Sequence, residues 1–166
     1  MAARGPRLVA GLRHAWDLAR QGPWRVAVAE GSMLPEIAPG DWLLVDPTVA
    51  RWPRRGSVVV FREPTSDILA VKRVAGVPGD SVPFQGGFLH LGPDEAWLTA
   101  DADPPTAAAA GFGVPVDSNR FGPVPLGLLV GRAWFRYAPL RRVGRLRRVV
   151  PRLARPPGSL VTPAGD

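Results

Sequence analysis

Short runs of β-branched and aromatic residues, separated by glycine and proline, dominate the central part of the chain. Such runs are typical of β-strands bounded by turns. The chain contains 20 prolines and 19 glycines, and each costs roughly 1 to 3 kcal/mol inside a helix, which disfavours a helical bundle. We therefore predict a mainly β, antiparallel domain. The predicted strands are Arg25–Ala29, Trp42–Asp46, Ser57–Arg62, Ile68–Ala75, Gly87–Leu91 and Leu128–Arg136.

Both ends of the chain instead place apolar residues at helical spacing among arginines. The apolar positions near the N-terminus are Leu8, Val9, Leu12, Trp16 and Ala19, and those near the other end are Leu140, Val143, Leu146, Val150 and Leu153. We predict a basic amphipathic segment at residues 1–22, a domain at 23–139, and a basic amphipathic helix with a disordered tail at 140–166. Such helices either lie on anionic lipid or pack their apolar side on the domain.

The net charge of +7 belongs to these ends, which carry +3 and +6, whereas the segment between them carries −2. No run approaches the roughly 20 apolar residues of a membrane-spanning helix, and the start lacks the apolar stretch of a secretory signal. We therefore expect a protein that is cytoplasmic or peripheral at the membrane, with nucleic acid an improbable partner. Residues 100–113 resemble a surface loop.

Metal chemistry has little support in the sequence. The chain has no cysteine, and its two histidines, His14 and His90, are isolated. Neither shows the spacing of metal ligands. We expect no metal and no cofactor.

Lysine usage is the most informative feature of the composition. Twenty of the 21 basic residues are arginine, and Lys72 is the one lysine. An arginine guanidinium stays protonated in proteins, whereas a buried lysine amine can lose its proton. Either codon bias left one lysine by chance, or the chain kept a removable proton at this position.

Ser32 is a candidate partner for the Lys72 amine. It follows Gly31 in the turn after the first predicted strand, while Lys72 lies inside the Ile68–Ala75 strand. A neutral lysine amine can act as the base that activates a serine hydroxyl without histidine or aspartate. Ser32 could equally be only a turn or helix cap.

Four blocks of sequence, in order, resemble those of type I signal peptidases, the S26 serine proteases that use a Ser/Lys dyad. They cover roughly residues 26–139, and together they are far more specific than any one alone. The blocks are GSMLPEIAPGDWLLVD, SVVVFR, VKRVAGVPGD, and DSNRFGPVP with VGRAWFRYAP.

The resemblance implies a signal-peptidase-like or LexA-like β fold and assigns roles to individual residues. Ser32 would be the nucleophile and would offer its own N–H to the oxyanion, and Lys72 would be the general base. The substrate would add as an extended strand between the two catalytic strands, and small side chains would enter shallow pockets, so that cleavage follows small residues, as in Ala-x-Ala. The pocket residues would be Val28, Met33, Ala70 and Val71.

Other residues are expected to support the site structurally. Arg73 would pair with Asp117 or Asp101 and hold the lysine strand, and Ser118 is retained from the family's closing block. The Gly40-Asp41 and Gly79-Asp80 pairs are typical of turns.

Three positions depart from the family pattern. Glu30 stands where many relatives have serine or glycine, and its carboxylate would oppose an oxyanion. Pro115 replaces the serine that touches the lysine, and Asn119 replaces an arginine.

The sequence leaves the biological role open among four hypotheses. A protein precursor with an N-terminal leader is the expected substrate, processed by a signal peptidase-like endopeptidase. Small S26 relatives that trim the propeptide of nickel superoxide dismutase offer a second hypothesis. A catalytically weak peptide-binding relative is the third, and a LexA-type regulator is the fourth, although the N-terminal 25 residues are too few for a helix-turn-helix domain.

Overall fold

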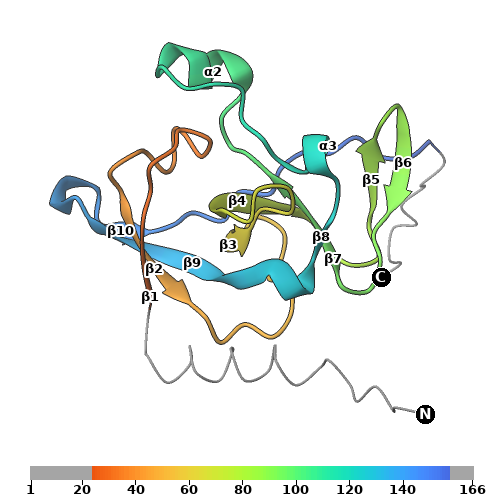
Figure 1. The fold of residues 1–166 in the computed structure, drawn as a ribbon, viewed down its shortest axis with the longest axis horizontal. Helices are drawn as coiled ribbons and strands as arrows, with labels where there is room; N and C mark the ends of the chain where they lie inside the picture. The colour runs from red at the N-terminus through yellow and green to blue at the C-terminus, as the bar shows by residue number, and fades with distance from the viewer. Residues whose placement is uncertain (1–23, 158–166) are drawn as a thin grey trace, which may run out of the picture.

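The computed structural model describes residues 24–157, which form a strongly curved antiparallel sheet with a small hairpin at one end (Figure 1). The order in the sheet is β1-β2-β9-β3-β4-β7-β8, and β10 pairs with β9. The strands are β1 Trp24–Ala27, β2 Trp42–Asp46, β3 Val58–Arg62, β4 Leu69–Gly76, β7 Glu95–Thr99, β8 Val124–Pro125, β9 Leu129–Ala138 and β10 Gly144–Arg145; the hairpin pairs β5 Ser81–Phe84 with β6 Gly87–His90. The mainly β prediction is confirmed.

Each of the six predicted strands corresponds to one of these, with ends within two residues. The prediction missed β5, β7, β8 and β10. Pro83 within β5 argues against a strand in the sequence, and β8 and β10 have only two residues each. β7 is short, with three consecutive apolar residues at its centre, and periodicity cannot distinguish such a run from a helix segment.

β3 lies at the centre of the fold, between β9 and β4. Its alternating side chains enter two different cores, because successive residues of a strand point to opposite faces. Val58 and Val60 pack in one core, whereas Val59 and Phe61 pack in the other. Burial on both faces explains why this strand is an unbroken apolar run.

Residues 140–157 do not form the predicted amphipathic helix. They comprise the 3₁₀ turn η2 (Leu140–Arg142), β10, and an extended stretch that ends at residue 157. Pro151 would break a helix at this point, and Gly144 pairs with Arg136 of β9. Two apolar positions of the stripe nevertheless pack on the domain, since Leu146 contacts one core and Leu153 the core beneath the β5–β6 hairpin.

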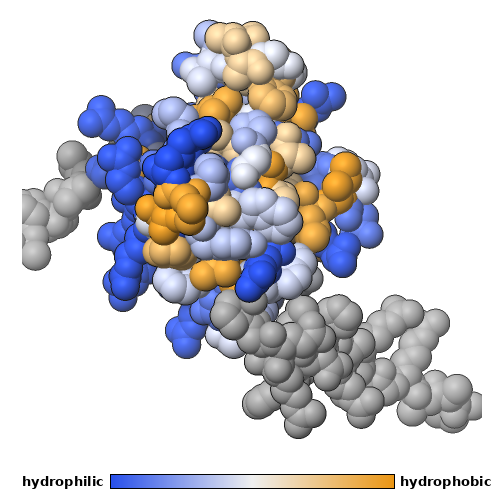
Figure 2. All heavy atoms as spheres, turned by 90° about the vertical axis from the view of Figure 1, so that its left-hand side faces the viewer, coloured by the Kyte–Doolittle hydropathy of each residue, from blue (hydrophilic) through white to orange (hydrophobic). Residues whose placement is uncertain are grey.

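The segment from 100 to 113, expected to be a surface loop, contains the short helix α2 (Pro104–Ala109). Asp103 caps it by accepting a hydrogen bond from Thr106 N at 2.8 Å. A second short helix, α3 (Ser118–Phe121), and the 3₁₀ turn η1 (Leu126–Leu128) follow. Figure 2 shows α2 as a protruding knob at the top of the molecule, pale orange because of its alanines.

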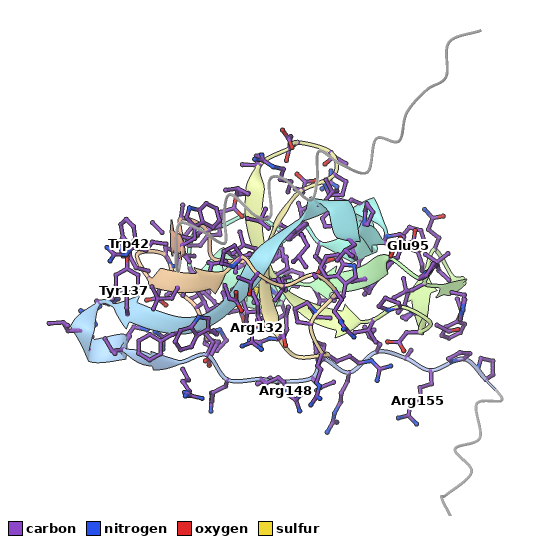
Figure 3. The ribbon with its side chains drawn as sticks, turned by 90° about the horizontal axis from the view of Figure 1, so that it is seen from below. Trp42, Glu95, Arg132, Tyr137, Arg148 and Arg155 are labelled. Carbon is purple, nitrogen blue, oxygen red and sulfur yellow. The ribbon has the colours of Figure 1, made fainter. Side chains whose placement is uncertain are left out.

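Within residues 24–157, no helix has the length and apolar character needed to cross a membrane. The predicted basic segment at 1–22 and the tail beyond 157 lie outside the described residues. Figure 3 places Trp42 beside Tyr137 at one end of the sheet, where their ring centroids are 6.2 Å apart, and Glu95 at the opposite end.

Candidate active site

Ser32 lies in a compact turn between β1 and β2. Two backbone hydrogen bonds close the turn, Leu34 N to Gly31 O at 3.2 Å and Ile37 N to Met33 O at 2.9 Å. Val28 continues the strand pairing beyond β1, because its N–H donates to Asp41 O at 2.9 Å. The nucleophile candidate is therefore held by backbone bonds on both sides.

Asp41 fixes the far end of this turn. Its carboxylate, 1% exposed, accepts a hydrogen bond from Ala38 N at 2.9 Å and pairs with Arg136 at 3.2 Å and Arg142 at 3.4 Å. Gly40 has φ of +88°, a conformation in which a side chain would be strained. The turn role expected for Gly40-Asp41 is confirmed, and so is that of Gly79-Asp80, where Asp80 accepts from Val77 N at 2.8 Å.

The two ends of the Ser32 residue differ in their hydrogen bonding. Its carbonyl oxygen accepts two bonds, from Asp101 N at 3.0 Å and Ala102 N at 3.1 Å. Its own N–H has no hydrogen-bond partner among residues 24–157. The peptide is therefore fixed in orientation, while its donor remains available to an incoming oxygen.

Lys72 lies in the middle of β4 and meets Ser32 through its side chain. Its amine Nζ donates to Ser32 Oγ at 2.8 Å and to the Val71 carbonyl at 3.1 Å. The two residues are only 2% and 8% exposed. The strands that lead to them are not neighbours in the sheet, because β2, β9 and β3 separate β1 from β4. The curvature of the sheet brings them together.

Burial lowers the pKa of Lys72 below its ordinary value, because desolvation disfavours the charged ammonium. Four carboxylates oppose this shift by attracting the ammonium form, with Glu30 the strongest, followed by Asp117, Glu63 and Asp101. The desolvation effect dominates. A lowered pKa increases the fraction of Lys72 that carries a neutral, proton-accepting amine.

Arg73, the residue after Lys72, is anchored by Asp101 and not by Asp117. Its guanidinium, 1% exposed, binds the two carboxylate oxygens of Asp101 at 2.7 and 2.5 Å, and it also donates to Gly56 O and Arg147 O. One aspartate therefore orients both halves of the site, since its side chain holds the lysine strand and its N–H holds the Ser32 carbonyl.

Asp117 and Ser118 use their side chains to accept hydrogen bonds from backbone N–H groups. Asp117 accepts from Ala100 N at 2.9 Å and caps α3 through Asn119 N at 3.0 Å. Ser118 is fully buried, and its hydroxyl accepts from Leu98 N at 2.9 Å. These bonds attach α3 to β7 and to the segment that leads into Asp101.

The four expected pocket residues, Val28, Met33, Ala70 and Val71, line one cavity of about 370 Å³. The walls of the cavity come from β1 and its continuation on one side and from the start of β4 on the other. Those two strand edges are not paired with each other. An extended peptide could hydrogen-bond to both edges, in the manner of β-strand addition.

A second cavity, of about 510 Å³, also includes Ser32 and is lined by Lys72, Glu30 and Pro115 among others. Phe112, which follows α2, forms part of its wall. A β-carbon on Gly31 would lie 2.4 Å from a ring carbon of Phe112, so the ring packs directly on the residue before Ser32. No sequence pattern pointed to Phe112, because it lies in the segment predicted to be a surface loop.

The described part of the chain offers no group of three or more histidine, cysteine, aspartate or glutamate residues arranged to hold a metal ion. The chemistry available at this site is that of a buried amine beside a hydroxyl.

Comparison with known proteins finds consistent similarities. The family model of signal peptidase, peptidase S26, matches residues 22–95. The chain is 30% identical over 139 residues to signal peptidase I of Leptolyngbya laminosa, covering 69% of this chain and 68% of that protein. It is 33% identical over 127 residues to mitochondrial ATP-independent inner membrane protease subunit 1b of Arabidopsis thaliana, covering 69% and 70%. Mitochondrial inner membrane protease subunit 2 of Schizosaccharomyces pombe is 30% identical over 132 residues, covering 73% and 68%.

Proposed function

This chain belongs to the S26 family of signal peptidases and is a serine endopeptidase, and we propose that Ser32 and Lys72 form its catalytic dyad in the removal of N-terminal leader segments. The observation that carries the proposal is the 2.8 Å hydrogen bond between Lys72 Nζ and Ser32 Oγ in a buried setting. Relatives named signal peptidase I and inner membrane protease support a precursor protein as the substrate.

Acylation would begin when Ser32 Oγ attacks the scissile carbonyl carbon and passes its proton to the neutral amine of Lys72. The carbonyl oxygen becomes an oxyanion, which the unpartnered N–H of Ser32 stabilises. The Lys72 ammonium then gives its proton to the nitrogen of the leaving segment, and the C–N bond breaks. An ester of Ser32 remains.

Deacylation would reverse these roles. Lys72, neutral again, takes a proton from a water molecule that attacks the ester carbonyl, and then returns it to Ser32 Oγ as the ester bond breaks. The peptide is released with a free carboxylate, and the dyad returns to its starting state.

Selection of small residues before the cleaved bond is consistent with the shape of the apolar cavity. Met33 and Val28, 1% and 8% exposed, are buried parts of its lining, and we expect them to limit the room for a large side chain. Small side chains such as alanine would fit between the edges of β1 and β4. We expect the leader to pair with these edges as an added strand.

The test uses the purified full chain and a fluorogenic peptide containing Ala-x-Ala. Cleavage is expected after the second alanine, with a loss of roughly 10³-fold or more in kcat for Ser32→Ala and for Lys72→Arg. The arginine variant keeps the charge but cannot accept a proton. Absence of cleavage by the wild-type chain, or cleavage retained by either variant, contradicts the dyad. Parallel assays with a signal-peptide precursor and a nickel superoxide dismutase precursor separate those two substrates.

We also propose that the basic C-terminal segment contacts anionic lipid. Figure 3 shows Arg148 and Arg155 projecting from the segment after β10, away from the sheet. Sedimentation with phosphatidylglycerol vesicles is expected to be stronger than with phosphatidylcholine vesicles, and to weaken as salt rises. Equal sedimentation with both would refute this contact.

A further inference from the structure

The two cavities beside Ser32 differ in a way that assigns each to one side of the cleaved bond. The two cavities share Glu30, Ser32 and residues 68–70, but only the 510 Å³ cavity includes Lys72. In the proposed function, Lys72 delivers a proton to the nitrogen of the leaving segment. The residues that follow the cleaved bond must therefore lie on the Lys72 side, and the 510 Å³ cavity, named here the leaving-side cavity, receives them.

Two carboxylates give the leaving-side cavity its charge. Glu30 precedes the nucleophile turn, and Glu63 follows the last residue of β3. Both line this cavity, and both also attract the ammonium form of Lys72. One guanidinium, that of Arg120, also lines this cavity. With the Lys72 amine neutral, the formal charge of the lining is −1.

Glu63 is held in place by its neighbours. Its two carboxylate oxygens accept hydrogen bonds from the hydroxyls of Thr65 and Ser66 in the β3–β4 connection. Partial burial works toward a higher pKa, but these bonds outweigh it and hold the pKa of Glu63 below its ordinary value. The group is therefore an ionised, preoriented carboxylate and not a freely rotating surface side chain.

The rest of the cavity wall is largely apolar, with contributions from Ile68, Leu69, Phe112, Val114 and Val116. Ile68 is 63% and Val114 70% exposed, although both are aliphatic. A lysine or arginine side chain combines a long apolar stem with a charged head and covers such a wall while its head meets a carboxylate. An acidic side chain in the same place would face Glu30 and Glu63 with like charge.

We propose that the leaving-side cavity is a subsite for a lysine or arginine side chain within the first two residues after the cleaved bond, with Glu63 and Glu30 as its specificity-determining carboxylates. This inference rests on the proposed function and names the class of precursor: a leader ending in small residues, followed by a basic mature N-terminus. Acidic residues at those two positions are disfavoured.

The experiment compares peptides that share Ala-Gln-Ala before the bond and carry lysine, glutamine or glutamate at the first or second position after it. The wild-type chain is expected to cleave the best lysine peptide with a kcat/KM about tenfold or more above its glutamate counterpart, with glutamine between them. In Glu63→Gln and in Glu30→Gln this ratio is expected to fall about threefold or more. Ratios within one variant cancel any change in the basicity of Lys72, since the same amine acts on every peptide.

Asp94→Asn is the matched control. Asp94 is an exposed carboxylate in the turn before β7 and lines neither cavity, so its neutralisation is expected to leave the ratio unchanged. Anisotropy of labelled peptides on Ser32→Ala gives a second readout without turnover, in which the lysine peptide binds more tightly than the glutamate peptide.

The outcomes separate the inference from the function on which it rests. Equal, Ser32-dependent cleavage of all three peptides overturns the subsite and leaves the dyad standing. A full lysine preference in both carboxylate variants, or a preference lost equally in Asp94→Asn, also overturns it. Failure of the wild-type chain to cleave any of the peptides removes the proposed function and the subsite together.

Discussion

Asp101 binds Arg73 through its side chain and Ser32 through its backbone, and so ties the two halves of the candidate site to one residue. The guanidinium of Arg73 meets both carboxylate oxygens at 2.7 and 2.5 Å, while the N–H of Asp101 lies 3.0 Å from the Ser32 carbonyl oxygen. Arg73 in turn follows Lys72 on β4. A shift of Asp101 would therefore move Ser32 and Lys72 relative to each other.

Removing the Asp101 carboxylate is expected to destabilise the fold. Asp101→Asn leaves the 1% exposed guanidinium of Arg73 without its counter-charge, and a buried charge that loses its partner costs about 3 kcal/mol or more. Urea unfolding monitored by tryptophan fluorescence measures the change. The matched control is Asp67→Asn, which breaks a 3.7 Å ion pair between Arg62 and Asp67, whose side chains are 49% and 81% exposed. Because that pair is exposed, we expect its loss to lower the free energy of unfolding by only about 0.5 kcal/mol. Equal losses in the two variants would contradict the buried role of Asp101.

The pH dependence of cleavage is expected to report the pKa of Lys72. Because burial lowers that pKa, kcat/KM should rise with pH to a midpoint below the ordinary lysine value of about 10.4. Glu30 stabilises the ammonium form, so Glu30→Gln should move the midpoint to lower pH. Initial rates measured from about pH 5 to about pH 10, which spans the ordinary lysine value, test this. A midpoint that rises or stays constant in Glu30→Gln would exclude this electrostatic coupling.

The same burial makes Lys72 a cost to stability, and the sign of its pH dependence follows from linkage. Below the lowered pKa of the folded state, Lys72 is charged in the folded and in the unfolded chain, and the full desolvation penalty on folding applies. As pH rises toward the pKa of the unfolded chain, the folded chain binds fewer protons than the unfolded chain, so this penalty decreases. Lys72→Met should therefore raise Tm at neutral pH, with a gain that shrinks toward pH of about 10. Thermal unfolding at a series of pH values tests this. A gain that grows with pH would have the wrong sign.

Gly31 is expected to tolerate no side chain while Phe112 stays in place. A β-carbon at position 31 would lie 2.4 Å from the Phe112 ring, and a displaced ring or turn would misplace the nucleophile, which costs up to about 100-fold in rate per ångström. We expect Gly31→Ala to lower kcat/KM by about tenfold or more, and Gly31→Ala/Phe112→Ala to recover part of that loss. Steady-state kinetics of the two single variants and the double variant complete the cycle. Strictly additive losses would show that the two residues act independently.

The sequence by itself determined the class of fold and singled out the candidate pair, Ser32 and Lys72. Alternating and continuous apolar runs set the strands around Trp42–Asp46 and Val58–Arg62, because side-chain period and turn residues are local properties of the chain. The scarcity of lysine singled out Lys72, and the blocks around Ser32 and Lys72 indicated the family. The structural roles of Asp41 and Asp80 were also predictable, since glycine-aspartate turns act within a few residues.

Only the tertiary structure decided how these parts meet. Periodicity tells which face of a strand is buried but not which strands pair, so the separation of β1 from β4 by three strands had no sequence signal. The choice of Asp101 over Asp117, the ring of Phe112 on Gly31, and the sharing of one cavity by Glu63 and Lys72 depend on contacts between distant segments. The apolar residues within 140–157 have helical spacing, yet the segment is not a helix. Gly144 and Arg145 pair with β9, and Pro151 disrupts helical hydrogen bonding. Tertiary contacts and proline outweigh a weak helix propensity.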